Sequence, residues 1–389
     1  MSRKLILSIP LIILLLMSAC SMPYPSPQVL PSDTPGAATV PVATDTLVAP
    51  TNTTAPTDTL QPTNTLAPTA TQPAVLPTLT PAPGGTANSN PAAGNYIDDR
   101  STPSQLIVSF YNAINRQEYS RAYGYYANPS SALGAFDAFA NGYKNTVSVG
   151  ITFGQLTSEG AAGSIYFTVP AILTANESGA IQSTYAVCYV IKQPQPANFG
   201  APPFHPMSIQ SGSGKKVPTG TDPNTACVGQ QTGVNNFPAG TESLSIDKNN
   251  FIDNRSGPIE TISSFLNAIN LKQYVRAYYY FDNAAAFPGN YVPWANGYSN
   301  TESVSVSFGT ILNEGAAGSL YYKVPMILVA QTTGSVTQTF VGCYTLRLAQ
   351  PGVQVQPPFR SMGIIGGKFT QVANNADTTA MLPTACNGL

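Results

Sequence analysis

Ser109–Tyr123 reads SFYNAINRQEYSRAY, and Ser264–Tyr278 reads SFLNAINLKQYVRAY. The two stretches lie 155 residues apart, and the similarity extends well beyond them. Residues 95–193 align without a gap on the residues 155 positions further along, and 46 of the 99 positions are identical. A repeat of this period has the size of a whole domain. The sequence therefore predicts two tandem copies of one domain, at 95–240 and 241–389.

Each copy is expected to begin with helices. Apolar residues recur with the i, i+3, i+4, i+7 spacing of one helical face at Ile107, Phe110, Tyr111 and Ile114. A second stripe comprises Tyr119, Ala122, Tyr123 and Tyr126. A third, short helix is predicted over Phe136 to Tyr143. The second copy keeps these stripes with conservative changes.

The period then switches from helical spacing to alternation. Apolar residues alternate with polar ones over 147–153, 165–173 and 185–191, and a shorter candidate strand includes Met207 and Ile209. Turns are predicted at Glu159–Gly160 and near Ser178–Gly179. Each copy is therefore predicted to be an α+β domain, with helices packed on one face of an antiparallel meander of three or four strands.

The order of these elements resembles a known superfamily. The sequence FYNAINRQEYSRAY, then FANGY at 139–143, then long hairpin strands, is similar to NTF2-like (cystatin-like) domains. The resemblance covers about residues 100–210 and 255–365. It implies a curved sheet wrapped around the helices to form a cone with a pocket. The Pro-rich end of each copy departs from the family pattern.

The amino terminus has the features of a secretory signal. A short basic stretch at residues 2–4 precedes an apolar run over 5–17, which is too short to span a bilayer as a helix. The run ends in Met17-Ser18-Ala19-Cys20, which resembles the lipobox of bacterial lipoproteins. The resemblance implies a signal peptide over 1–19 and a lipid on Cys20. The alternative is an ordinary signal peptide followed by a chance cysteine.

A Pro- and Thr-rich stretch follows Cys20. Residues 21–94 carry fifteen prolines and only three charged residues. Such a composition cannot bury enough apolar surface to form a core, so residues 20–94 are predicted to be a disordered stalk. Whether the stalk is a glycosylated spacer or a passive linker stays open. The expected location is the outer face of a bacterial membrane, at the cell surface or in the periplasm.

The four remaining cysteines fit disulfides in an exported chain. Cys188 aligns with Cys343, and Cys227 aligns with Cys386 after a four-residue insertion. Pairing within each copy explains this arrangement, so the predicted disulfides are Cys188–Cys227 and Cys343–Cys386.

The sequence offers few residues for catalysis or metal binding. Charged residues make up 9% of the chain, the net charge is −1, and His205 is the single histidine. These features predict no metal site, no cofactor and no nucleic-acid partner. His205, aligned with Arg360, is interpreted as a surface residue. No catalytic residue is assigned.

Several charged positions are shared by the two copies. We interpret Asp98 and its counterpart Asp253 as turn or cap residues, and Glu159 with Glu314 as exposed hairpin residues. Arg121, matched by Arg276, is expected to form a structural salt bridge with Glu159 or Asp98 and their counterparts.

Shared aromatic residues provide the candidate binding site. Core packing is the ordinary role of a helical aromatic stripe, and a pocket for an apolar or glycan ligand is the functional alternative. The candidate pocket residues are Tyr123, Tyr125, Tyr143, Tyr278, Tyr280, Trp294 and Tyr298.

Three functions remain in competition. The first is a non-enzymatic binding or interaction module held at the membrane by the lipid on Cys20, whose partner is an envelope polymer, a glycan or a protein. The second is an isomerase- or dehydratase-type enzyme of the NTF2-like kind, and the third is a purely structural envelope protein. A buried carboxylate facing a tyrosine across a closed cavity would favour the enzyme.

Overall fold

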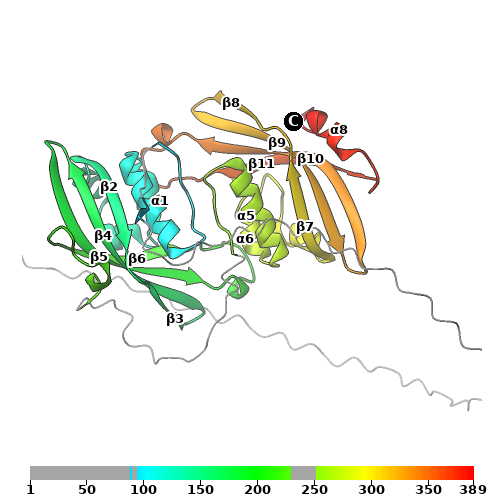
Figure 1. The fold of residues 1–389 in the computed structure, drawn as a ribbon. Helices are drawn as coiled ribbons and strands as arrows, with labels where there is room; N and C mark the ends of the chain where they lie inside the picture. The colour runs from blue at the N-terminus through cyan, green and yellow to red at the C-terminus, as the bar shows by residue number, and fades with distance from the viewer. Residues whose placement is uncertain (1–87, 90–93, 229–250) are drawn as a thin grey trace, which may run out of the picture. The chain divides into compact units, whose positions relative to one another are not determined.

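The computed structural model describes residues 88–89, 94–228 and 251–389 (Figure 1). The predicted signal peptide, Cys20, nearly all of the stalk and the predicted boundary between 240 and 241 lie outside the described residues. Below, residues 94–228 are called the first half and residues 251–389 the second half.

The first half begins with helices and continues with strands, as predicted. Its helices are α1 (Pro103–Asn115), α2 (Tyr119–Tyr123), α3 (Pro129–Leu133) and α4 (Phe136–Gly142). Its strands are β2 (Thr146–Phe153), β3 (Thr157–Ala161), β4 (Ser164–Glu177), β5 (Ile181–Pro194) and β6 (Ser208–Lys216). Short 3₁₀ helices η1 (Pro196–Asn198) and η2 (Pro223–Thr225) complete it.

The second half follows the same order. Its helices are α5 (Pro258–Asn270), α6 (Tyr274–Tyr278), α7 (Tyr291–Asn296) and α8 (Thr378–Met381). Its strands are β7 (Thr301–Phe308), β8 (Leu312–Ala316), β9 (Ser319–Thr332), β10 (Val336–Ala349) and β11 (Gly363–Val372). Two 3₁₀ helices are η3 (Pro351–Val353) and η4 (Leu382–Thr384).

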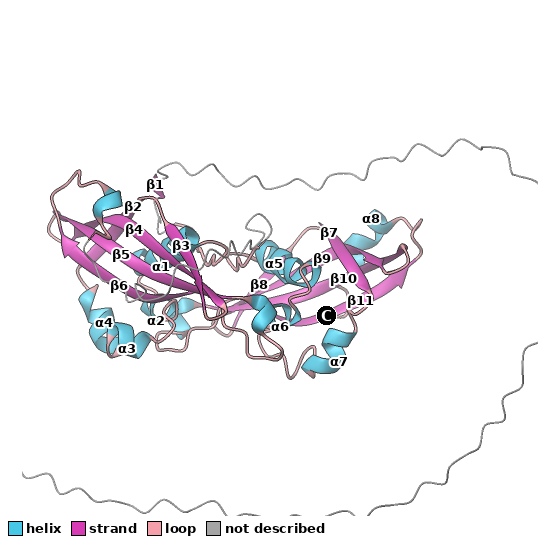
Figure 2. Cartoon of the chain, turned by 90° about the horizontal axis from the view of Figure 1, so that it is seen from below, coloured by secondary structure: helices cyan, strands magenta, loops and turns pink. Residues whose placement is uncertain are grey.

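Each half contains one antiparallel sheet, which confirms the α+β class (Figure 2). The first sheet has six strands in the order β1-β2-β4-β5-β6, where β1 is Asn88–Ser89 and β3 pairs with β4. The second has five strands in the order β11-β10-β9-β7, and β8 pairs with β9. Each sheet thus has more strands than the three or four predicted.

The additional strand pairings depend on the length of β4. Its amino-terminal part pairs with β3 and its carboxyl-terminal part pairs with β2, so both strands lie along the same edge. The predicted turn at Glu159–Gly160 is wrong, because both residues belong to β3. The chain reverses at Ala162 and Gly163, whose φ values of 46° and 70° suit a tight hairpin turn. The turn predicted near Gly179 is confirmed.

Alternation along β5 separates the two faces of the first sheet. Val187, Tyr189 and Ile191 belong to the core that also includes residues of α1. The side chain of Thr102 caps α1, and Pro103 occupies its first turn. The intervening residue Cys188 is also buried, with 2% of its surface exposed. The helices therefore cover one face of the sheet, and Cys188 is covered by other residues.

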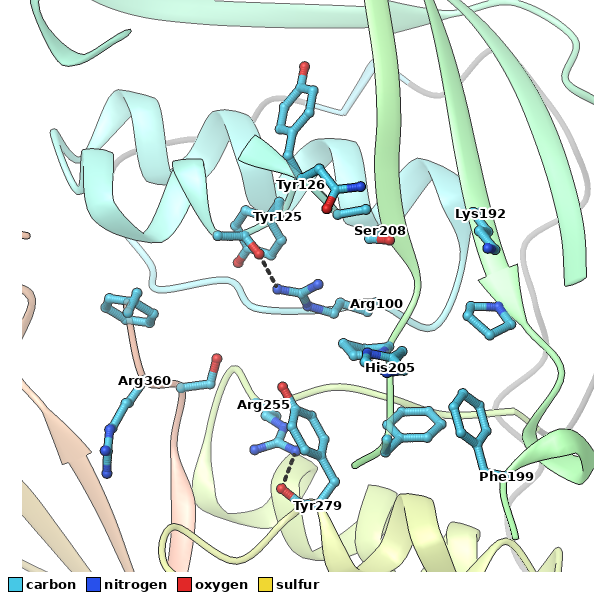
Figure 3. A pocket seen from close by; sticks show the side chains of 18 of the residues that line it. Arg100, Tyr125, Tyr126, Lys192, Phe199, His205, Ser208, Arg255, Tyr279 and Arg360 are labelled. Atoms are coloured by element: carbon cyan, nitrogen blue, oxygen red, sulfur yellow. Dashed lines mark hydrogen bonds between the residues drawn. The ribbon is translucent and has the colours of Figure 1, made fainter. Parts of the chain in front are cut away.

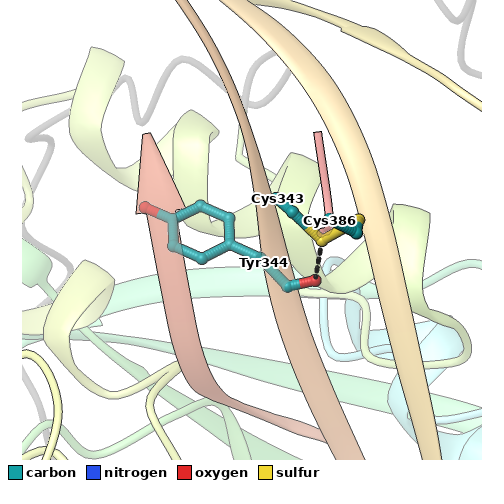
Figure 4. Close-up of a disulfide and its surroundings, with 3 residues drawn as sticks. All are labelled: Cys343, Tyr344 and Cys386. Carbon is teal, nitrogen blue, oxygen red and sulfur yellow. Dashed lines mark hydrogen bonds between the residues drawn. A yellow bond between two sulfur atoms is a disulfide. The ribbon is translucent and has the colours of Figure 1, made fainter. Parts of the chain in front are cut away.

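The two disulfides provide that cover. Cys188 of β5 is bonded to Cys227. Cys343 of β10 is bonded to Cys386, as Figure 4 shows. Both predicted pairings are confirmed. Ala226, next to Cys227, packs in a small cluster with Ile172 and Ala186. The segment after β6 is therefore tied across the sheet face opposite the helices.

One junction between the halves is formed by a short segment of each. Residues 98–101 lie beside residues 253–256, and Asp99 forms an isolated antiparallel bridge with Asn254. Because Asn254 stands 155 positions after Asp99, each residue pairs with its own counterpart. This relationship is that of a local twofold axis.

Two backbone hydrogen bonds beside this bridge follow the same symmetry. The N–H of Arg100 donates to the carbonyl oxygen of Asp253 at 2.7 Å. In return, the N–H of Arg255 donates to the carbonyl oxygen of Asp98 at 2.6 Å. The two halves are therefore connected directly by backbone hydrogen bonds.

Candidate functional site

A cavity of about 460 Å³ lies between the helices and the inner face of the first sheet. Its lining comes from α1, from the segments that follow α2 and α4, and from strands β2, β4, β5 and β6. The aromatic residues that line it are Tyr111, Tyr126, Tyr143, Tyr185 and Tyr189. We call this cavity the tyrosine pocket. Its volume is in the range of ordinary small-molecule sites.

Two glycines of β6 keep the pocket open. Gly212 is paired with Tyr189, and Gly214 with Val187. A Cβ atom on Gly212 would lie 2.8 Å from the ring of Tyr189, and one on Gly214 would lie 3.1 Å from a methyl group of Val187. Any side chain at these positions would therefore displace a wall residue or enter the pocket.

Three hydroxyl groups of the pocket are neutral, those of Tyr111, Tyr143 and Tyr189. Burial raises the pKa values of Tyr111 and Tyr189 well above 10, and their hydroxyl oxygens lie 2.5 Å apart, within hydrogen-bond distance. Burial also raises the pKa of Tyr143 to about 12. These groups therefore remain protonated at physiological pH and can both donate and accept hydrogen bonds.

Glu177 is the one charged residue among the described residues that line the pocket. It is the last residue of β4 and is half-buried. Asn145 and Thr146 contribute further polar groups. The lining therefore combines aromatic rings, neutral hydrogen-bonding groups and one carboxylate.

The corresponding positions of the second half differ in a consistent way. Tyr111, Tyr126 and Tyr185 are replaced by residues without a hydroxyl group, namely Leu266, Phe281 and Phe340. The residue opposite Gly342 in the sheet is Phe369, where the first half has Gly214 opposite Val187. The ring of Phe369 packs on Tyr344, the counterpart of Tyr189, with 4.7 Å between centroids. A phenyl ring thus occupies the volume that Gly214 leaves open.

The predicted pocket residues of the first half have three different positions. Tyr143 lines the tyrosine pocket, while Tyr125 lines a second cavity between the halves. Tyr123 packs on Phe136 and Phe139, and its hydroxyl donates to the carbonyl of Gly134 at 2.7 Å. Tyr123 is therefore a packing residue.

The predicted pocket residues of the second half pack into its core. Tyr280 is fully buried, and its hydroxyl donates to Asp253 at 2.8 Å. Tyr278, Trp294 and Tyr298 pack against the core cluster, with Trp294 in contact with both tyrosines.

Four lining tyrosines were not assigned to a pocket by sequence reasoning. Tyr111 and Tyr126 belong to helical stripes, and Tyr185 and Tyr189 to a strand alternation, so all four look like core residues. The available signal was the pair Gly212 and Gly214, because alternate glycines on a strand remove two side chains from one face.

Asp98 has a different role from the predicted turn or cap. It is 2% exposed, and its carboxylate accepts hydrogen bonds from Tyr125 at 2.9 Å and Tyr96 at 3.3 Å. Burial opposes ionisation, but Arg100 and Arg121 outweigh it and hold the pKa of Asp98 below its usual value. The carboxylate is therefore ionised and engaged in structure, which makes it a poor general base.

The predicted partners of Arg121 are also corrected. Its Nε donates to the carboxylate of Glu118 at 2.6 Å, and both side chains are buried. Glu159, which was one predicted partner, is an exposed residue of β3. In the second half Gln273 replaces Glu118, so this ion pair is specific to the first half.

No cluster of three or more His, Cys, Asp or Glu side chains suited to a metal ion occurs within the described ranges. No family model, curated protein or solved structure matches this chain.

Proposed function

We propose that this chain is an exported, lipid-anchored protein that binds a small molecule in the tyrosine pocket without changing it chemically. The observation that carries the proposal is the contrast between the halves. Gly214 leaves a cavity lined by tyrosines in the first half, whereas Phe369 fills the matching volume in the second half.

The lining indicates the class of ligand. Glu177 disfavours anions, and no basic side chain among the described lining residues offsets its charge. Aromatic faces beside neutral hydroxyl groups suit a molecule that has an apolar ring face and hydroxyl groups at its edge. We therefore propose an uncharged saccharide of about one ring as the ligand.

The proposal includes two tandem domains of the NTF2-like type. Strands β4 and β9 each have 14 residues and begin at Ser164 and Ser319, which are 155 positions apart. Corresponding strands are neighbours in both sheets. This correspondence supports duplication, and helices followed by a long antiparallel sheet support the NTF2-like assignment.

Export is supported by the two disulfides, since such bonds persist in oxidising compartments. Anchoring is supported by the sequence around Cys20 alone. Within the described part of the chain, no helix combines the length and hydropathy needed to cross a membrane.

The binding test uses glucose and N-acetylglucosamine as probes, measured by isothermal titration calorimetry on the chain from Cys20 onward. The key variant is Val187→Gly with Gly214→Phe, which gives the first half the arrangement found in the second. We expect binding by the wild type and no detectable binding by this variant. Tyr344→Phe in the second half is the matched control for Tyr189→Phe, and only Tyr189→Phe should weaken binding.

Three outcomes would contradict the proposal. They are the absence of saccharide binding up to about 10 mM, equal binding by the filled variant, and chemical conversion of the bound sugar. Native mass spectrometry of the purified protein gives an independent reading of any ligand that it retains.

A further inference from the structure

A second cavity, of about 800 Å³, lies where the two halves meet. Its walls include counterparts from both halves, such as Arg100 with Arg255 and His205 with Arg360. The cavity therefore spans the local twofold relationship set by the bridge between Asp99 and Asn254. We call it the central cavity (Figure 3).

Basic side chains predominate in its lining. Among the described residues of the lining, Asp282 is the one acidic residue, and the basic residues are Arg100, Arg121, Lys192, His205, Arg255 and Arg360. Asp282 lies 3.5 Å from Arg347, and Arg121 is paired with Glu118. Five basic residues of the lining remain after Arg121 is set aside, and the one carboxylate of the lining, that of Asp282, is already paired with Arg347.

Two of these cations are held in fixed positions. Arg100 donates to the carbonyl oxygens of Met207 and Gly124 and lies over the ring of Tyr125. Arg255 donates to the carbonyl oxygens of Met362 and Tyr279 and lies over the ring of Tyr279. A guanidinium has five N–H donors, so each head group retains donors for a ligand.

Two further cations have no ion-pair partner within the part of the chain that the structure describes. Among the described residues, ion pairs join Arg116 and Arg121 to Glu118, and Arg347 to Asp282. Lys192 and Arg360 take part in none of them. Lys192 is half-buried on the first-half wall, and Arg360 is exposed on the second-half side.

Aromatic residues complete the wall on one side. Phe204 of the first half packs on Tyr279 of the second half, with 5.6 Å between ring centroids, and Phe199 packs on Phe204 at 5.1 Å. An organic ligand would therefore find an apolar surface next to the basic groups.

We propose that the central cavity binds a small organic oxyanion, whose carboxylate or phosphate groups contact the basic residues of the lining, among them Lys192, Arg360, Arg100 and Arg255. The uncharged saccharide proposed for the tyrosine pocket is a different class of ligand. The two proposals can therefore fail separately, because different probes test them.

The test uses inorganic phosphate and citrate as probes, with binding to the chain from Cys20 onward measured by calorimetry at low salt. Lys192→Gln and Arg360→Gln are combined in one variant. The control combines Lys215→Gln with Lys216→Gln, two exposed changes that remove the same charge outside the cavity. We expect the double variant to lose about 10- to 100-fold in affinity for the better probe, while the control keeps the wild-type value. Circular dichroism verifies that both variants fold.

Either of two results would overturn this inference: neither probe binds up to about 10 mM, or the double variant and the control bind equally. A preference for phosphate or for citrate identifies which oxyanion the cavity accepts. Binding should also weaken as salt rises to about 0.5 M, since screening reduces the attraction between exposed charges.

Discussion

Gly214 and Phe369 occupy equivalent positions on the last strands of the two sheets, and only one of them carries a side chain. Their partners on the neighbouring strand show the opposite pattern. Val187, which has a side chain, faces Gly214, and Gly342, which has none, faces Phe369. A Cβ on Gly342 would lie 2.5 Å from the Phe369 ring, so the large residue needs the small partner.

This exchange predicts non-additive stability. Gly214→Phe alone should reduce the free energy of unfolding by about 1–3 kcal/mol, because its ring would overlap Val187. Adding Val187→Gly should recover part of that loss. Urea denaturation of the single and double variants measures the coupling, and strictly additive changes would show that the two positions do not share a volume.

Replacement of Asp98 should destabilise the fold by an amount that depends on pH. Because Arg100 and Arg121 hold its folded pKa below the unfolded value of about 3.9, its carboxylate stabilises the fold above that pH. This contribution disappears as the pH falls through the folded pKa. Asp98→Asn should therefore cost about 2–4 kcal/mol at pH 7 and progressively less below pH 4. Denaturation curves from pH 7 to 3 provide the measurement.

Asp99 is the matched control for that experiment. Burial raises its pKa, so ionised Asp99 opposes folding at neutral pH and its contribution improves as the pH falls. Asp99→Asn should therefore be neutral or stabilising at pH 7. If both variants showed the same pH dependence, the electrostatic account of Asp98 would be wrong.

Two serine hydroxyls form hydrogen bonds between the halves, and their removal tests how much these contacts contribute to stability. The hydroxyl of Ser256 accepts the N–H of Asp98, and that of Ser101 accepts the N–H of Asp253, both at 2.9 Å. Ser101→Ala and Ser256→Ala should each cost about 1–3 kcal/mol by leaving a backbone donor unpaired. Exposed Ser131→Ala in α3 should cost almost nothing. Separate unfolding transitions for the two halves of the wild type would contradict this coupling.

The disulfides predict similar losses in both halves. They close loops with sequence separations of 39 and 43 residues, so replacing either pair by serines should cost about 3–4 kcal/mol. The variants are Cys188→Ser with Cys227→Ser and Cys343→Ser with Cys386→Ser. Unchanged denaturation midpoints would contradict this prediction, because they would show that the disulfides do not stabilise the fold by lowering the conformational entropy of the unfolded chain.

Cys20 predicts the cellular location. Cys20→Ser should release the protein from the membrane fraction or leave the precursor uncleaved. Fractionation followed by mass spectrometry of the amino terminus detects either result. Normal processing together with membrane retention would refute the anchor.

Sequence reasoning succeeded where a local pattern determines the structure. The stripe at Ile107 and Phe110 predicted α1, and the alternation at Val187 and Tyr189 predicted β5. It failed at Glu159, because β3 forms only where β4 extends beyond the part that pairs with β2, and the sequence pattern does not show that length. The shared cysteines gave the disulfides, since alignment of the copies leaves one pair in each.

The site was harder to predict because packing and lining residues have the same sequence pattern. Tyr123 and Tyr189 both belong to apolar stripes, yet only Tyr189 lines the pocket. The difference arises across the sheet at Gly212 and Gly214, which no local periodicity reveals. The bridge between Asp99 and Asn254 was likewise missed, because it joins two irregular segments.

The position of the first disulfide has a mechanical consequence. Cys227 lies just before the stretch that leads to the second half, and its partner Cys188 lies in β5, between β4 and β6. If the second half is pulled away from the first, the force enters the first half along the chain at Cys227. The disulfide passes the force directly to Cys188 in β5, so that β6, which lies between the two cysteines in the sequence, does not carry it. The edge strand is therefore shielded from being peeled away, and the load falls on the strand with neighbours on both sides.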